Sequence, residues 1–166
     1  MKILICNVGS TSLKYQLFQM DDGEKVIYTV VTTDYKGLML FAFANGKMAK
    51  VELMNYYTKS NRKKLIAAYS DKSEIRSILM IEDDTEIVAF TDNNKVLAID
   101  TANIPLKSTK STQGVQVMKI TKKGASVTKV VLAKDSGIEN VKHYKTKNIP
   151  AAGSFLRSED VQMSLF

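Results

Sequence analysis

The chain has little cysteine, little histidine and no long apolar run. Cys6 is the only cysteine among its 166 residues, so no internal disulfide can form, and we expect a reducing, cytoplasmic compartment. The single histidine, His143, has no cysteine or histidine partner at ligand spacing, which argues against a metal site. The longest apolar run, residues 38–44, is far shorter than the ~18 residues that a membrane span needs. These absences argue against a disulfide scaffold, a histidine-based metal centre and a membrane-spanning helix.

Arginine is also scarce, because lysine supplies almost all of the positive charge. The chain has 21 Lys and 3 Arg and a formal net charge of +7. Such a field attracts polyanions such as DNA, RNA or anionic lipid. Lysine contacts a phosphate as a point charge and lacks the bidentate fork by which arginine reads guanine, so we expect backbone binding with little sequence discrimination. An ordinary solvated basic surface is the alternative.

Short apolar stretches rich in β-branched and aromatic residues predict an all-β body. They are separated by Asn, Asp, Gly and Lys, and two of the separators, "NGK" at 45–47 and "DNNK" at 92–95, are typical of hairpin turns. The predicted strands lie within "KVIYTVVTT", "LMLFAFANGKMAKVEL", "IRSILMI", "TEIVAFTDNNKVLAID", "VQVMKI" and "ASVTKVVLA".

The body contains an internal repeat. An offset of 48 in the numbering aligns Asn45 with Asn93 and Lys47 with Lys95, and a shorter echo returns "TANIP" at 101–105 as "TKNIP" at 146–150. A period of about 40 to 50 residues in an all-β chain is typical of propeller blades. We therefore predict a partial β-propeller of two to three four-stranded blades. Since closed propellers have about four to eight blades, the arc stays open or is completed by self-association.

Three segments are expected along the chain. Residues 1–22 form a hairpin pattern ending at "DDG", residues 23–160 hold the blades, and residues 161–166 form a tail. The hairpin segment carries no net charge, so the charge of +7 belongs to residues 23–166.

Basic clusters at matching repeat positions are the predicted binding site. "KSNRKK" at 59–64 places four cations within six residues, "KSTK" occupies the matching position of the second repeat, and "TKKG" at 121–124 extends the track. Serine, threonine and asparagine between the cations can donate hydrogen bonds to phosphate oxygens. The candidate DNA-binding residues are Lys59, Arg62, Lys63, Lys64, Lys107, Lys110, Lys122 and Lys123.

Catalytic patterns are weak. "EDD" at 82–84 suggests either a magnesium site or, more simply, a solvated turn before a strand. The sequence contains no glycine-rich phosphate loop of the Walker type, and it offers no convincing Ser-His-Asp or Cys-His set. We expect no catalysis from this chain alone, no metal and no cofactor.

The body resembles the C-terminal domain of bacterial type IIA topoisomerase A subunits, the family that includes the A subunits of DNA gyrase and topoisomerase IV. The resemblance rests on "VVTTDYKGLMLFAFANGKMAKVEL", "TKSNRKKLIAAYS", "TKSTQGVQVMKI" and "IPAAGSFLRSED", which occur in the family's order. It implies a β-propeller that binds and bends double-stranded DNA around a basic rim, with the remaining topoisomerase A and B subunits as partners. The cleavage tyrosine domain and the basic, glycine-rich box of gyrase-type subunits have no counterpart here.

Residues 1–20 resemble a different family, the acetate and butyrate kinases. "MKILICNVGSTSLKYQLF" matches their extreme N-terminus, and the resemblance implies a phosphate-side role for Asn7, Ser10, Ser12 and Lys14. Nothing after Gly23 supplies the nucleotide-binding halves that such an enzyme needs. A phosphotransferase fragment therefore remains an alternative function, and a fused or foreign hairpin is the simpler interpretation.

The tail offers a third function, docking to another protein. "QMSLF" resembles the short peptide by which bacterial replication proteins bind the sliding clamp. The resemblance implies that Met163, Leu165 and Phe166 fill apolar pockets while Gln162 makes a directional hydrogen bond. A tail without a partner is the alternative.

Overall fold

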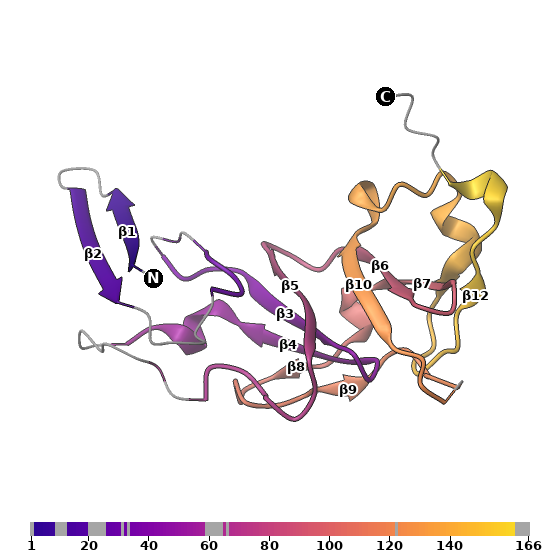
Figure 1. Cartoon of the computed structure of the whole chain (residues 1–166), viewed down its shortest axis with the longest axis horizontal. Helices are drawn as coiled ribbons and strands as arrows, with labels where there is room; N and C mark the ends of the chain where they lie inside the picture. Colours follow the sequence, from indigo (N-terminus) through magenta and orange to yellow (C-terminus); the bar gives the residue numbers. More distant parts are fainter. Residues whose placement is uncertain are drawn as a thin grey trace. The chain divides into compact units, whose positions relative to one another are not determined.

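The computed structural model describes residues 2–8, 13–19, 26–30, 32, 34–58, 65, 67–121 and 123–161 (Figure 1), the first two ranges by their backbone alone. The chain divides into two compact units, Met1–Tyr35 and Lys36–Phe166. Within the described residues no helix is long and apolar enough to cross a membrane. The predicted boundary at residue 22 lies outside the described residues.

The first unit contains the predicted hairpin. Strands β1 (Lys2–Val8) and β2 (Leu13–Gln19) pair antiparallel, with Asn7 opposite Lys14. Ser10 and Ser12, which the kinase resemblance implicates with them, lie outside the described residues. The strand predicted in "KVIYTVVTT" is wrong over its described part, because residues 26–30 belong to no strand. β-Branched residues favour a strand only where a neighbouring strand pairs with them, and no described strand pairs with these residues.

The second unit consists of two twisted sheets. In the first sheet the strand order is β5-β3-β4-β8, and β9 also pairs with β4; the second sheet has the order β10-β6-β7-β11, and β12 also pairs with β7. The first sheet comprises β3 (Leu38–Phe43), β4 (Lys47–Glu52), β5 (Ile75–Ile81), β8 (Leu106–Lys107) and β9 (Val115–Gln116). The second comprises β6 (Glu86–Thr91), β7 (Lys95–Asp100), β10 (Val127–Leu132), β11 (Lys145–Thr146) and β12 (Ser154–Phe155).

The predicted 48-residue repeat is confirmed by the two central hairpins. Adding 48 to the first and last residue numbers of β3 and β4 gives those of β6 and β7. Gly46 (φ 80°) and Asn94 (φ 62°) occupy the two turns, which need a residue that tolerates positive φ. Helical structure in the described residues is confined to 3-10 turns of three or four residues. These are η1 (Leu53–Tyr56), η2 (Thr101–Asn103), η3 (Ala133–Asp135), η4 (Val141–Tyr144) and η5 (Ser158–Asp160).

Strand exchange links the two sheets. The chain leaves the second sheet after β7, returns to the first sheet to add β8 and β9 to β4, and only then forms β10 of the second sheet. β11 and β12 add to β7 at the equivalent positions, and both are offset from β8 and β9 by 39 in the numbering. The "TANIP" and "TKNIP" segments, offset by 45, are therefore not structural equivalents. The third unit of the repeat has no hairpin of its own and serves to complete the second sheet.

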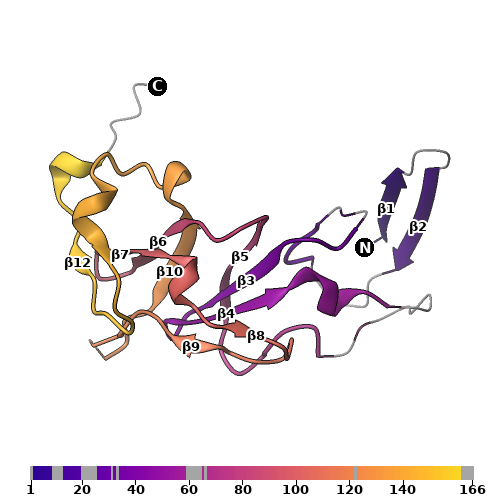
Figure 2. The same cartoon turned by 180° about the vertical axis from the view of Figure 1, so that it is seen from behind.

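The principal core is shared by both sheets. Alternate residues of β3, together with Met48 of β4, pack with alternate residues of β6 and β7, so each sheet covers the other's inner face. Figure 2 shows the two sheets next to each other. The fully buried residues of this core include Leu40, Met48, Ile87, Leu97, Ile99, Ile104, Val117 and Met118. Each such side chain contributes ~1.5–3 kcal/mol when it leaves water, which neither sheet could gain alone.

The outer face of the second sheet is covered by the end of the chain. Ile138 and Tyr144 pack on Val88, Val96 and Ala98. The Tyr144 hydroxyl donates to Asp160 Oδ2 at 2.5 Å and accepts a hydrogen bond from the Arg157 backbone N–H at 3.0 Å. The 3-10 turns η3, η4 and η5 thus occupy the face on which a third blade would pack, and the two sheets form an open arc (Figure 1).

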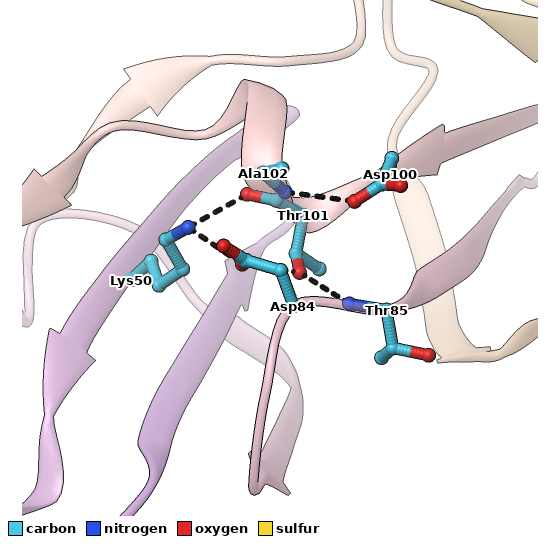
Figure 3. A network of polar contacts seen from close by, with 6 residues as sticks. All are labelled: Lys50, Asp84, Thr85, Asp100, Thr101 and Ala102. Carbon is cyan, nitrogen blue, oxygen red and sulfur yellow. Dashed lines mark hydrogen bonds and ion pairs between the residues drawn. The ribbon is translucent and has the colours of Figure 1, made fainter.

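A buried lysine joins the sheets at one end of the shared core (Figure 3). Lys50 of β4 donates to Asp84 Oδ1 at 2.7 Å and to the Thr101 carbonyl at 2.8 Å, and the Thr101 hydroxyl donates to Asp84 Oδ1 at 2.7 Å. Burial raises the pKa of Asp84, but hydrogen bonds from Lys50 and Thr101 and the charge of Lys50 together hold it below its ordinary value. Because the Lys50 side chain is only 6% exposed, these acceptors replace the water that its ammonium group loses on burial.

Substitution of Gly114 tests the strand exchange, because at this residue the chain that returns to the first sheet passes close to β4. Gly114 and Gly137 have similar positive φ values of 72° and 70°, but a Cβ on Gly114 would overlap the Met48 carbonyl oxygen, whereas one on Gly137 would meet nothing within 4 Å. We expect Gly137→Ala to lower the free energy of unfolding by about 1 kcal/mol, the left-handed penalty alone. Gly114→Ala should lower it by roughly 3 kcal/mol or more. Equal losses in urea unfolding would contradict the exchange.

Candidate nucleic-acid interface

Strand exchange places the second basic cluster at the edge of the first sheet. β8 pairs parallel with β4, so that Lys107 lies opposite Val51. Three residues on, Lys110 Nζ donates to the Asn55 carbonyl at 3.0 Å and lies 5.6 Å from the centre of the Tyr56 ring. The cluster "KSTK" therefore lies along the chain that leads from β4 toward the basic segment, defined here as residues 59–64.

Three aromatic side chains, those of Phe41, Tyr56 and Tyr69, hold the chain in place before and after the basic segment. The Tyr56 hydroxyl, before it, donates to the Ala68 carbonyl, after it, at 2.8 Å. The ring centre of the buried Phe41 lies 6.5 Å from that of Tyr56 and 6.4 Å from that of Tyr69. These distances lie within the favourable range for aromatic pairs. The chain is thus tied to β3 of the first sheet at Tyr56 and at Tyr69, which precede and follow the basic segment in the sequence.

Ion pairs neutralise a few cations elsewhere on the body. Among the described residues, Lys145 pairs with Glu86 at 2.8 Å, Arg76 with Glu74 at 2.9 Å and Arg157 with Glu159 at 3.5 Å. The hydrogen bond to Glu86, and then the charge of that carboxylate, raise the pKa of Lys145. Lys107 and Lys110 make no ion pair with any carboxylate that the structure describes. Lys107 and Lys110 therefore keep their positive charge, whereas Lys145, at the equivalent β7–β11 edge, is neutralised by Glu86.

The structure brings together only some of the predicted binding residues. Lys107 lies beside β4 and Lys110 beside η1. Lys123, by contrast, is an exposed residue of the connection to β10, where Ser126 binds Asp92 in the turn of the second hairpin. The remaining candidates, Lys59, Arg62, Lys63, Lys64 and Lys122, lie outside the described residues, as do the tail residues Gln162, Met163, Leu165 and Phe166.

The acidic and histidine candidates have neighbours within the fold. Asp84 of the "EDD" turn is the partner of Lys50, a role that neither interpretation of the turn anticipated, while Glu82 and Asp83 are exposed. His143 packs edge-on against Tyr144, with ring centres 5.0 Å apart. No cluster of three or more potential metal ligands occurs in the described part of the chain.

Sequence reasoning missed the tyrosines. Tyr56 and Tyr69 lie on opposite sides of the basic segment, and nothing in their spacing indicated that both contact Phe41. Tyr57 and Tyr69 are 53% and 41% exposed, so aromatic surface accompanies the cations at this edge. The proximity of aromatic residues to each end of "KSNRKK" was the only available signal.

The fold is similar to that of two solved C-terminal topoisomerase domains. A scan against family models and a search of curated proteins return no match. The C-terminal domain of DNA topoisomerase IV matches with a TM-score of 0.62 and 19% identity over 82% of this chain and 49% of that one. The DNA gyrase A C-terminal domain matches with a TM-score of 0.63 and 16% identity over 96% of this chain and 63% of that one.

These likenesses confirm the predicted fold. The body is all-β, consists of blade-like sheets and has the architecture of the C-terminal domains of gyrase A and topoisomerase IV. The chain spans about half to somewhat less than two thirds of the length of the two solved domains, with coverages of 49% and 63%. Two sheets without closure agree with that shorter length.

Tyr56 should report the integrity of this edge through its ionisation. Burial raises its pKa from 10.0 to about 12. A raised pKa means that folding favours the neutral phenol, so the stabilisation is complete below pH 10 and is lost as the pH rises through 12. We expect the difference in free energy of unfolding between the wild type and Tyr56→Phe to shrink over that range. Urea titrations at pH 9 and pH 12 measure it, and a constant difference would show that Tyr56 is not buried as described.

Proposed function

We propose that this chain acts in the cytoplasm as a DNA-binding accessory domain of a type IIA topoisomerase A subunit. It holds double-stranded DNA by lysine–phosphate contacts without reading its sequence. The observation that carries the proposal is the position of "KSTK", one of two basic clusters at matching positions of the repeat: it lies at the β4–β8 edge of the first sheet, beside the chain that leads into the other cluster. The likeness in fold to topoisomerase C-terminal domains supports the same function.

The covalent chain limits how far the basic segment can lie from this edge. Lys59 follows Tyr56 by three residues and Lys64 precedes Ala68 by four, and Tyr56 and Ala68 are joined by a hydrogen bond. An extended chain spans at most ~3.6 Å per residue, which limits how far these cations can lie from Lys107 and Lys110. A group of up to six cations can therefore act on one stretch of phosphate backbone: Lys59, Arg62, Lys63, Lys64, Lys107 and Lys110.

The mechanism is electrostatic. Each lysine near a phosphate releases condensed counterions, so the affinity falls steeply with salt, with a slope of about −0.9 per neutralised phosphate. Binding of this kind is weak, on the order of 10⁻⁴ to 10⁻⁶ M at physiological salt, and tolerates any sequence. Such a domain would hold DNA near a strand-passage core supplied by the remaining topoisomerase A and B subunits.

Charge reversal with a matched control tests the proposal. Lys63→Glu with Lys64→Glu changes the charge of the basic segment by four units. Lys129→Glu with Lys134→Glu makes the same change in charge at exposed residues of β10 and η3. β10 is an edge strand of the second sheet, at the opposite edge from β11. We expect the first pair to weaken binding of a fluorescent 30-bp duplex at least about 10-fold and to reduce the salt slope by about 1.8, the value for two phosphate contacts.

The control pair lowers the overall charge equally, so it corrects for long-range attraction. It should weaken binding no more than about threefold and leave the salt slope unchanged. Circular dichroism verifies that both variants fold. Similar losses in the two pairs would mean that binding follows net charge alone, and no loss in either would dismiss the β4–β8 edge as the DNA-binding surface.

A further inference from the structure

Two exposed tyrosines lie at the base of the basic segment. Tyr57 immediately follows Tyr56, Tyr69 immediately follows Ala68, and a 2.8 Å hydrogen bond joins Tyr56 to Ala68, so the two tyrosines adjoin the two ends of one tertiary contact. Their exposed fractions, 53% and 41%, leave a large part of each side chain accessible. An edge that binds only duplex backbone needs cations and hydrogen-bond donors, and does not account for this aromatic surface.

Tyr69 is held in a defined orientation. Its ring is stacked on that of Phe41 at an interplanar angle of 26°, with ring centres 6.4 Å apart. Phe41 is 3% exposed and belongs to β3, so the ring that supports Tyr69 is part of the folded sheet. A ring that is supported on one face and accessible elsewhere is preorganised for stacking, because little side-chain freedom remains to be lost on binding.

A positive charge lies beside Tyr56, the residue that precedes Tyr57. Lys110 Nζ is 5.6 Å from the centre of the Tyr56 ring, and the basic segment occupies the sequence between Tyr57 and Tyr69. Cations that contact phosphates together with aromatic rings that contact bases are the two components of single-strand binding surfaces. In an intact duplex the base faces are already stacked on each other, so only an unpaired base can use the rings.

We propose that the base of the basic segment binds single-stranded DNA, with Tyr69 and Tyr57 stacking on an unpaired base and Lys110 contacting the adjacent phosphate. The inference rests on the proposed function for its phosphate contacts and adds a base-dependent contact to them. Stacking of one base on an aromatic residue strengthens binding about 5- to 150-fold, largely independently of which base it is.

The test compares two single strands that differ only in their bases. Fluorescently labelled dT12 and a 12-residue abasic strand carry the same phosphates, so the ratio of their affinities isolates the base contact. For the full chain we expect dT12 to bind at least about fivefold more tightly. Tyr57→Ala with Tyr69→Ala should bring the ratio to near 1, and Tyr69→Phe alone should keep it, since its ring can still stack. Tyr28→Ala, which removes a tyrosine that is 38% exposed in the other unit, is the matched control and should also keep the ratio.

Each outcome has one meaning. Because the ratio is taken within each variant, a general loss of affinity or partial unfolding cancels, and Tyr57→Ala alone serves if the double variant is unstable. A wild-type ratio near 1 alongside clear binding of duplex DNA would overturn this inference and leave the proposed function intact. A ratio that the alanine variants do not change would place the base contact elsewhere and would also overturn it. If neither strand nor the duplex binds at low salt, the proposed function fails as well.

Discussion

Neither sheet of the body can bury its inner face alone, and strand exchange provides the partner. β6 and β7 lie in the sequence between β4 and the strands β8 and β9 that complete the first sheet, so the two sheets are interleaved along the chain. Leu40 and Met48 then share one core with Ile87 and Ile99. Lys50 depends on the same arrangement, since its buried ammonium group bonds to Asp84 and Thr101 beside the second hairpin. The two blades should therefore fold as one cooperative unit.

The same exchange forms the candidate interface. Lys107 and Lys110 follow the second hairpin in sequence but lie on the first sheet, next to the chain that leads into the basic segment. Without the exchange, the two basic clusters would lie on separate blades. The outer face of the second sheet is covered by Tyr144, whose hydroxyl binds Asp160. The topology that gives the core thus also concentrates the charge.

Local patterns in the sequence predicted much of the body. The Asn-Gly turn at 45–46, its counterpart at 93–94 and the short apolar stretches around them gave the two hairpins their correct 48-residue period. Pairing between distant segments was not predictable, because a two-residue strand such as β8 has no periodicity of its own. For this reason the return of "TANIP" as "TKNIP" suggested a structural equivalence that the fold does not have. Likewise, the Lys50–Asp84 pair and the Phe41–Tyr69 contact join residues far apart in the sequence, where no local rule applies.

The central claim is that DNA binds along the β4–β8 edge, and amide hydrogen exchange of the full chain with and without a 30-bp duplex tests it most directly. The account predicts slower exchange in the presence of DNA at residues 53–58, 67–70 and 106–112, with β10 (Val127–Leu132) unchanged. Slower exchange confined to β10 and the C-terminal turns, or spread evenly over the whole body, would contradict it.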